Sequence, residues 1–93
     1  MSALAAWTRF QPVSVIGEVQ KPARYELKSW VTVLDVLALA GGLNEYAARN
    51  RIVVLRPDGG GMRRIPFNYN KVISGKDDNE NFYLRNGDII LVP

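Results

Sequence analysis

The segment Leu84-Arg85-Asn86-Gly87-Asp88-Ile89-Ile90-Leu91-Val92-Pro93 places a polar turn directly before a short, wholly apolar strand. Four aliphatic residues in a row, bounded by turn residues, predict a buried strand at residues 89–92. Gly87 permits the tight turn that precedes this strand. Asp88 follows it, and its short carboxylate is expected to accept hydrogen bonds from backbone amides of the turn.

A second unit of this kind lies near the start of the chain, where residues 13–19 are rich in Val and Ile. This composition predicts a strand, and Gly17 near its end permits a bulge or a tight turn. Pro22 lies at the centre of the following turn, where its fixed φ ends the strand pairing. Residues 24–28 then return as a second strand, so that the two segments form a hairpin.

A helix is predicted from Thr32 to Ala40. Thr32 is a suitable N-cap, and Asp35 stands three residues later, as in a capping box. Gly41-Gly42 end the helix, and one of them is expected to supply the left-handed residue that follows many helix C-termini. At about 100° per residue, the helix has one core face. That face consists of Val33, Val36, Leu37 and Ala40, and Leu34 and Leu39 fall outside it.

The remaining elements are a strand at 52–56, a turn at 57–61, a return strand at 62–67, a helical turn at 68–74 and a polar loop at 75–81. The order is therefore strand, strand, helix, strand, strand, short helix, strand. One helix laid across a mixed, strongly bent sheet is typical of the α+β β-grasp fold, a ubiquitin-like roll, in which the first and last strands lie side by side in the middle. We expect one domain at residues 13–93, preceded by a leader or linker at residues 1–12.

The composition excludes several classes of functional site. The 93 residues contain no Cys and no His, so the usual zinc, haem and iron–sulfur sites lack their ligands. Gly59-Gly60-Gly61 lacks the Lys-Ser/Thr pair of a phosphate-binding loop. Residues 77–81, an Asp/Asn/Glu run, lack the frame of a calcium-binding loop. We therefore predict no enzyme, no catalytic residue, no metal and no cofactor.

Charge and hydropathy point to no nucleic acid and no membrane span. The net charge is +3, and only two of the cations, Arg63 and Arg64, are adjacent. The longest apolar stretch, residues 31–40, is about half of the length that spans a bilayer, and residues 1–6 lack the features of a signal peptide. We interpret the chain as a domain excised from a longer protein, with any targeting signal upstream.

Several segments together carry a family resemblance. They are residues 15–19 with Pro22 and Tyr25, residues 32–43, residues 52–56, and Asn81, Leu84 and residues 87–93. In this order and spacing they resemble the soluble-ligand-binding β-grasp (SLBB) domain, and more narrowly the copies in bacterial polysaccharide export proteins. The more specific parts are the Ala-Gly-Gly-Leu end of the helix and the Gly-Asp-x-Ile-x-Val-Pro terminus. Arg24 departs from the pattern, because the family commonly has Gly there.

The resemblance implies a periplasmic module of an outer-membrane, ring-forming exporter of capsule or exopolysaccharide. Its partners are then sibling domains or subunits of a homo-oligomer and the polysaccharide, with no nucleic acid expected. Membrane contact is expected only through parts absent from this chain. We expect a non-catalytic role in assembly of the periplasmic conduit, with weak polysaccharide contact. The alternative is a β-grasp module that binds a soluble ligand or nucleic acid.

Both faces of the predicted sheet are apolar. The strands at 52–55 and 89–92 carry aliphatic side chains at every position. Because successive side chains of a strand point to opposite faces, one short helix leaves the second face without a cover. Two arrangements remain open. Either the sheet curls until it covers itself, or another domain or subunit covers the second face.

The candidate ligand contacts are Arg63, Arg64 and Tyr69, which offer cations to acidic sugars and an aromatic face to sugar rings. Tyr25 and Trp30 are expected instead to cap the small core. Structural roles in turns and caps are assigned to Gly17, Pro22, Thr32, Gly41, Gly42, Gly87 and Asp88.

Overall fold

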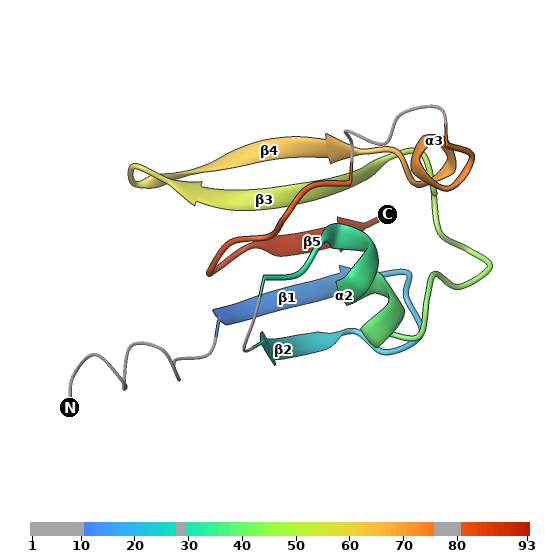
Figure 1. Cartoon of the computed structure of the whole chain (residues 1–93), viewed down its shortest axis with the longest axis horizontal. Helices are drawn as coiled ribbons and strands as arrows, with labels where there is room; N and C mark the ends of the chain where they lie inside the picture. The colour runs from blue at the N-terminus through green and yellow to red at the C-terminus, as the bar shows by residue number, and fades with distance from the viewer. Residues whose placement is uncertain (1–10, 28–29, 76–80) are drawn as a thin grey trace.

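The computed structural model describes residues 11–27, 30–75 and 81–93. Its elements follow the order expected from the sequence (Figure 1). They are β1 (Gln11–Gly17), β2 (Ala23–Leu27), α2 (Val33–Leu39), β3 (Ile52–Asp58), β4 (Gly61–Phe67), α3 (Tyr69–Ile73) and β5 (Ile89–Val92). The α+β, β-grasp-like architecture predicted from the sequence is confirmed.

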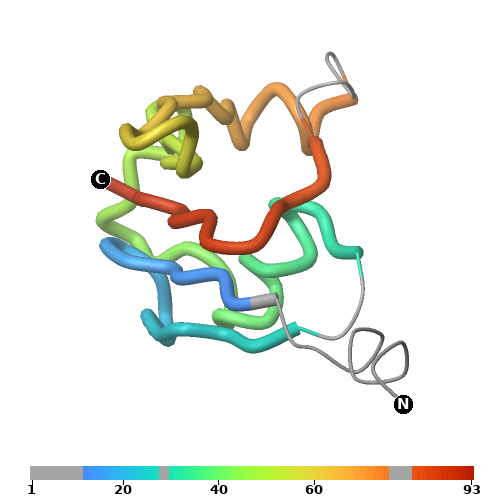
Figure 2. Tube along the Cα trace, turned by 90° about the vertical axis from the view of Figure 1, so that its left-hand side faces the viewer, coloured from blue at the N-terminus to red at the C-terminus, as the bar shows by residue number. Residues whose placement is uncertain are grey.

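The five strands form one mixed sheet in the order β2-β1-β5-β3-β4. β1 and β5 pair in parallel at its centre, which confirms that the first and last strands lie side by side. The other neighbouring strands pair antiparallel. Figure 2 shows α2 and α3 on the same side of this sheet. One face of the sheet therefore has a helical cover, and the other has none among the described elements.

The core lies between α2 and the face of the sheet that α2 covers. The predicted core face of the helix is confirmed, because its four residues are at most 2% exposed. Alternate residues of the three central strands meet them, and each fully buried aliphatic side chain stabilises the fold by about 1.5–3 kcal/mol. The strand residues in this layer are Val13 and Val15 of β1, Ile52 and Val54 of β3, Ile90 and Val92 of β5, and Phe67 of β4.

β1 starts and ends two residues before the strand predicted at 13–19. Gly17 ends it with φ +98°, a backbone conformation that other residues rarely adopt. A side chain here would also collide with β5, since a Cβ built on Gly17 lies 1.9 Å from the carbonyl oxygen of Val92. Val19 lies beyond the end of β1 but is still buried, with only 4% of its surface exposed. It forms an isolated β-bridge with Leu43.

The β3–β4 hairpin has a tighter turn than the predicted one at 57–61. β3 continues to Asp58 and β4 begins at Gly61, so that only Gly59 and Gly60 form the turn. Their φ values of +57° and +91° are both positive, as a two-residue type I′ turn requires. Pro66, which cannot donate to a ladder, is tolerated because β4 is an edge strand.

Both ends of α2 are capped by local hydrogen bonds. The Thr32 hydroxyl accepts from the amide of Asp35 at 3.3 Å, and the Asp35 carboxylate accepts from the amide of Thr32 at 2.9 Å. At the other end, the amide of Gly41 donates to Ala38 and that of Gly42 donates to Leu37, the pattern of a Schellman motif. These caps fix the length of the helix and so limit the area of sheet that it covers.

Candidate functional site

The face of the sheet opposite α2, which we call the outer face, carries an apolar row across four strands. Strand register pairs Ile16 with Leu91, Leu91 with Val53, and Val53 with Pro66. Residues paired in this way point to the same face. None of the four is in the buried core, and Ile16 is 45% exposed. The sheet therefore does not enclose its second apolar face within the part of the chain that is described.

A second row of side chains runs beside the first on the outer face, with an arginine at each end. From β2 to β4, the paired residues are Arg24, Ser14, Ile89, Leu55 and Arg64. Arg24 lies 3.9 Å from Glu26 on the same edge strand, with both side chains more than half exposed. The outer face thus has an apolar centre, both signs of charge at its β2 edge, and a cation at its β4 edge.

A buried ion pair lies at one end of the helix-covered face of the sheet. Arg56 of β3 holds the fully buried Asp88 with Nη2 at 2.8 Å and Nε at 3.1 Å from the carboxylate oxygens. Asp88 also accepts from the amide of Arg85 at 2.8 Å, within its own turn. Paired charges with their remaining lone pairs satisfied can be buried, whereas single charges are costly there. The pair ties the turn before β5 to β3, and no local sequence pattern pointed to it.

An exposed aromatic pair lies beside this ion pair. Trp30 is 69% exposed and Tyr83 is 61% exposed, and their ring centroids are 6.4 Å apart at an interplanar angle of 82°. The expectation that Trp30 caps the core is wrong. Tyr25 is half-buried against the core, as expected, and its hydroxyl donates to the carbonyl of Lys21 at 2.6 Å.

The three residues proposed from the sequence as ligand contacts do not gather at one place. Arg63 and Arg64 are consecutive in β4, so their side chains lie on opposite faces of the sheet. Register pairs Arg63 with Arg56 on the helix side and Arg64 with Leu55 on the outer face. Tyr69 begins α3, beyond the other end of β4, where the guanidinium of Arg49 lies 5.6 Å from its ring centroid.

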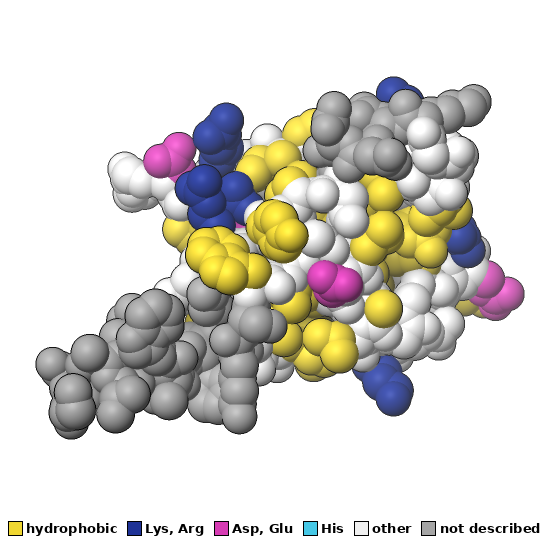
Figure 3. All heavy atoms as spheres, in the orientation of Figure 1, with side chains coloured by type: hydrophobic (Ala, Val, Ile, Leu, Met, Phe, Trp, Pro, Cys, Tyr) yellow, Lys and Arg dark blue, Asp and Glu magenta, His cyan; other side chains and the backbone are white. Residues whose placement is uncertain are grey.

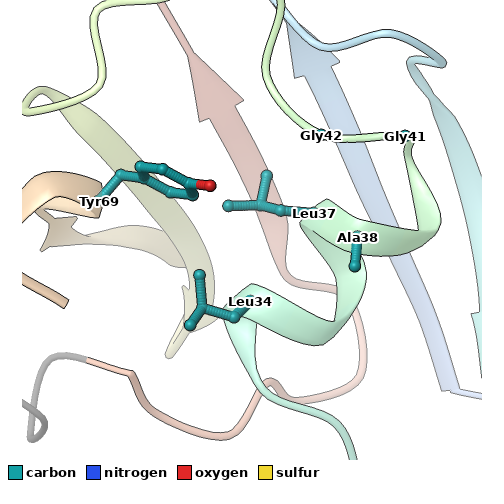
Figure 4. Close-up of a pocket in the computed structure, with 6 residues that line it drawn as sticks. All are labelled: Leu34, Leu37, Ala38, Gly41, Gly42 and Tyr69. Atoms are coloured by element: carbon teal, nitrogen blue, oxygen red, sulfur yellow. The ribbon is translucent and has the colours of Figure 1, made fainter. Parts of the chain in front are cut away.

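Tyr69 lines a cavity of about 400 Å³ between α2 and α3. Figure 4 shows Tyr69 and Leu37 pointing toward one another across it, with Gly41 and Gly42 at one side. Leu34 and Ala38 complete the lining, so no charged side chain among the described residues lines this space. The cavity suits an apolar group or the face of a ring rather than an ion.

The described residues also limit other kinds of site. Residues 11–27, 30–75 and 81–93 contain no cluster of three or more acidic, His or Cys residues able to hold a metal ion. Within these same ranges, no helix is long and apolar enough to cross a bilayer. The acidic run considered as a calcium loop lies almost wholly outside the described residues, which resume at Asn81.

The chain matches the model of a known domain family. The model of the SLBB domain matches residues 12–66, which is more than half of the 93-residue chain. The matched part covers nearly all of β1 and β4 and the whole of β2, α2 and β3. No curated protein matches the chain.

Proposed function

The chain belongs to the SLBB domain family, and we propose that it is a non-catalytic module of a bacterial outer-membrane protein that exports capsule or exopolysaccharide. In the periplasm it helps to assemble the oligomeric conduit and makes weak contact with the passing polymer. The observation that carries the proposal is the outer face, where an apolar row crosses four strands without a cover among the described elements. Contiguous apolar surface of this kind marks contact with another protein.

We assign the outer face to a second copy of the domain. The β2 edge offers the exposed carboxylate of Glu26, beside Arg24, while Arg64 lies on β4, at the opposite side of the same face. A neighbouring copy can therefore bring unlike charges together around an apolar centre. The half-buried state of the central side chains fits a contact that forms after folding, since the isolated domain already shields them in part.

The absence of a catalytic role is supported by the use that the fold makes of its buried acid. Asp88 is engaged by Arg56 and by the amide of Arg85. The sequence also offers no thiol and no imidazole for nucleophilic or acid–base chemistry. The polymer contacts predicted at Arg63, Arg64 and Tyr69 remain part of this proposal.

Sedimentation of the 93-residue chain over a range of concentrations tests the assembly role. We expect the chain to self-associate weakly, and Ile16→Lys to abolish the association because it places a charge in the apolar row. Leu39→Lys is the matched control, since Leu39 is 52% exposed but lies on α2, away from the outer face. A chain that stays monomeric throughout, or equal effects of the two variants, would refute the assignment.

A soluble-ligand role is the second candidate, and the cavity beside Tyr69 favours it. Its volume of about 400 Å³ lies within the usual range for small-molecule sites. A screen of small apolar and cyclic ligands by NMR distinguishes the two roles. Shifts centred on Gly42 and Tyr69 would favour the soluble-ligand role if the outer face proved inert in sedimentation.

A further inference from the structure

We propose that Trp30 and Tyr83, together with Arg63 and Arg85, form a contact site for a polysaccharide that carries carboxylate groups. The inference rests on the proposed function for the class of ligand, and it adds the place and the charge of the polymer. Figure 3 views the side that carries α2 and shows basic side chains gathered directly beside exposed hydrophobic ones, between the β3–β4 hairpin and the start of α2.

Hydrogen bonds anchor the backbone beside the exposed aromatic pair. Backbone hydrogen bonds join the two segments that carry it, from Leu84 to Val31 at 2.8 Å and from Val33 to Phe82 at 3.1 Å. The carbonyl of Tyr83 also accepts from Nη2 of Arg56 at 3.1 Å. A tryptophan that is 69% exposed on such an anchored segment contributes little to the core. The edge-to-face arrangement leaves ring faces open, and an aromatic face packs well on the apolar C–H surface of a sugar ring.

Arg63 and Arg85 form no ion pair within the part of the chain that the structure describes. The ion pairs among the described residues are Arg24–Glu26 and Arg56–Asp88. Arg63 lies directly across the ladder from Arg56 on the helix side of the sheet, and the exposed Arg85 follows Tyr83 by two positions. Asp58, on the same side of the hairpin, forms no ion pair with either arginine. Among the described residues, Arg63 and Arg85 therefore keep their guanidinium groups free of ion pairs, although the exposed carboxylate of Asp35 also lies near Tyr83, at the Thr32–Tyr83 bridge.

The chemistry of these groups selects the ligand. A guanidinium binds a carboxylate through two parallel hydrogen bonds, a geometry that a neutral hydroxyl cannot match. Two arginines beside two aromatic rings thus fit a chain of uronic acid residues, with sugar faces on the rings and carboxylates on the cations. Single-stranded nucleic acid also uses aromatic and basic groups, but it prefers a continuous groove in which successive bases stack. The perpendicular rings of Trp30 and Tyr83 do not offer such a series.

Titration with an oligogalacturonate tests the site at a chain concentration where sedimentation shows only monomer. A Trp7→Phe background leaves Trp30 as the sole tryptophan and so as the fluorescent reporter. We expect binding that weakens as salt rises. The double variant Arg63→Gln with Arg85→Gln should reduce the affinity by roughly tenfold or more. Each hydrogen bond between charged groups contributes more than about 1.4 kcal/mol, the loss that lowers the affinity tenfold. NMR titration of Trp30→Ala should show a similar loss.

Arg51→Gln is the matched control, because Arg51 is also exposed but precedes β3 at the far end of that strand. It should bind as the unsubstituted chain does. Equal binding of a neutral glucan of the same length, or an equal loss in Arg51→Gln, would overturn the proposal. Tighter binding of an oligothymidylate at the same salt concentration would assign the surface to nucleic acid instead. A negative result in this titration would not bear on the assembly role, because sedimentation of Ile16→Lys tests self-association separately.

Discussion

The two faces of the sheet are built from the same kinds of residue but differ in how deeply their side chains are buried. Along β5, Ile90 and Val92 are at most 1% exposed under α2, whereas Ile89 and Leu91 point to the outer face and remain partly exposed. This difference in burial comes from α2, which covers one face, and not from the composition of β5, because the side chains on both faces are aliphatic. Apolar residues in a strand thus mark two kinds of surface, one buried by folding and one available for association.

Among the changes considered, removal of the buried carboxylate of the helix-covered face should lower the free energy of unfolding most. Asp88→Ala leaves the guanidinium of Arg56 buried without its partner, and we expect a loss of about 3–5 kcal/mol in the free energy of unfolding. Urea denaturation followed by circular dichroism measures it. The double variant Asp88→Ala with Arg56→Met should recover part of the loss. A double variant no more stable than Asp88→Ala would show that the charge is not the cause.

The central pair of strands, which both faces share, can be disrupted at Gly17. Gly17→Ala adds a Cβ that lies 1.9 Å from the carbonyl oxygen of Val92, at a φ of +98°, so the backbone must move. We expect a loss of about 3 kcal/mol or more, measured in the same way. Gly42→Ala is the control, because its φ is +86° but its Cβ meets nothing within 4 Å. It should cost about 1–2 kcal/mol, and equal losses would argue against the close approach.

Adjacent valines of β3 compare the two faces directly. Val54 is fully buried under α2, and its neighbour Val53 points to the outer face. Val54→Ala should lower the free energy of unfolding by about 2–3 kcal/mol, whereas Val53→Ala should lower it by less than about 1 kcal/mol. In sedimentation the order should reverse, with Val53→Ala weakening self-association more. Equal destabilisation by both variants would show that the outer face is buried within the single chain.

The cap of α2 should give the smallest effect. Thr32→Ala removes the hydroxyl that accepts from the amide of Asp35, at an expected cost of about 1 kcal/mol. Thr32→Ser should restore most of it. Hydrogen exchange of the first turn of α2 reports whether the loss is local to the helix that forms the cover.

Much of the fold could be predicted from local signals. The helix between Thr32 and Gly41, its core face and the order of the strands all follow from caps, glycines and apolar periodicity. The limits of β1 could not, because Gly17 ends the strand through a contact with Val92, which is far away in the sequence. The Arg56–Asp88 pair likewise depends on the β3–β5 pairing, because its two residues are 32 positions apart in the sequence.

The candidate site was harder to predict. Arg63 and Arg64 look like one basic site because they are adjacent, yet strand alternation alone places them on opposite faces. From the sequence, Trp30 is expected to cap the core, as an aromatic side chain often does. Its exposure arises from the pairing of residues 31–33 with residues 82–84, which holds the ring outside the helix-covered layer. Such a pairing leaves no periodic signal in the sequence.

The central position of β5 has a consequence for folding. β1 and β2 form one hairpin, β3 and β4 form another, and the two hairpins are joined in the sheet only through β5. All four of those strands precede it in the chain, so on the ribosome each hairpin can close while its partner stays unattached. The sheet is completed only when residues 89–92 have emerged, and until then two half-sheets must wait with their inner edges unpaired.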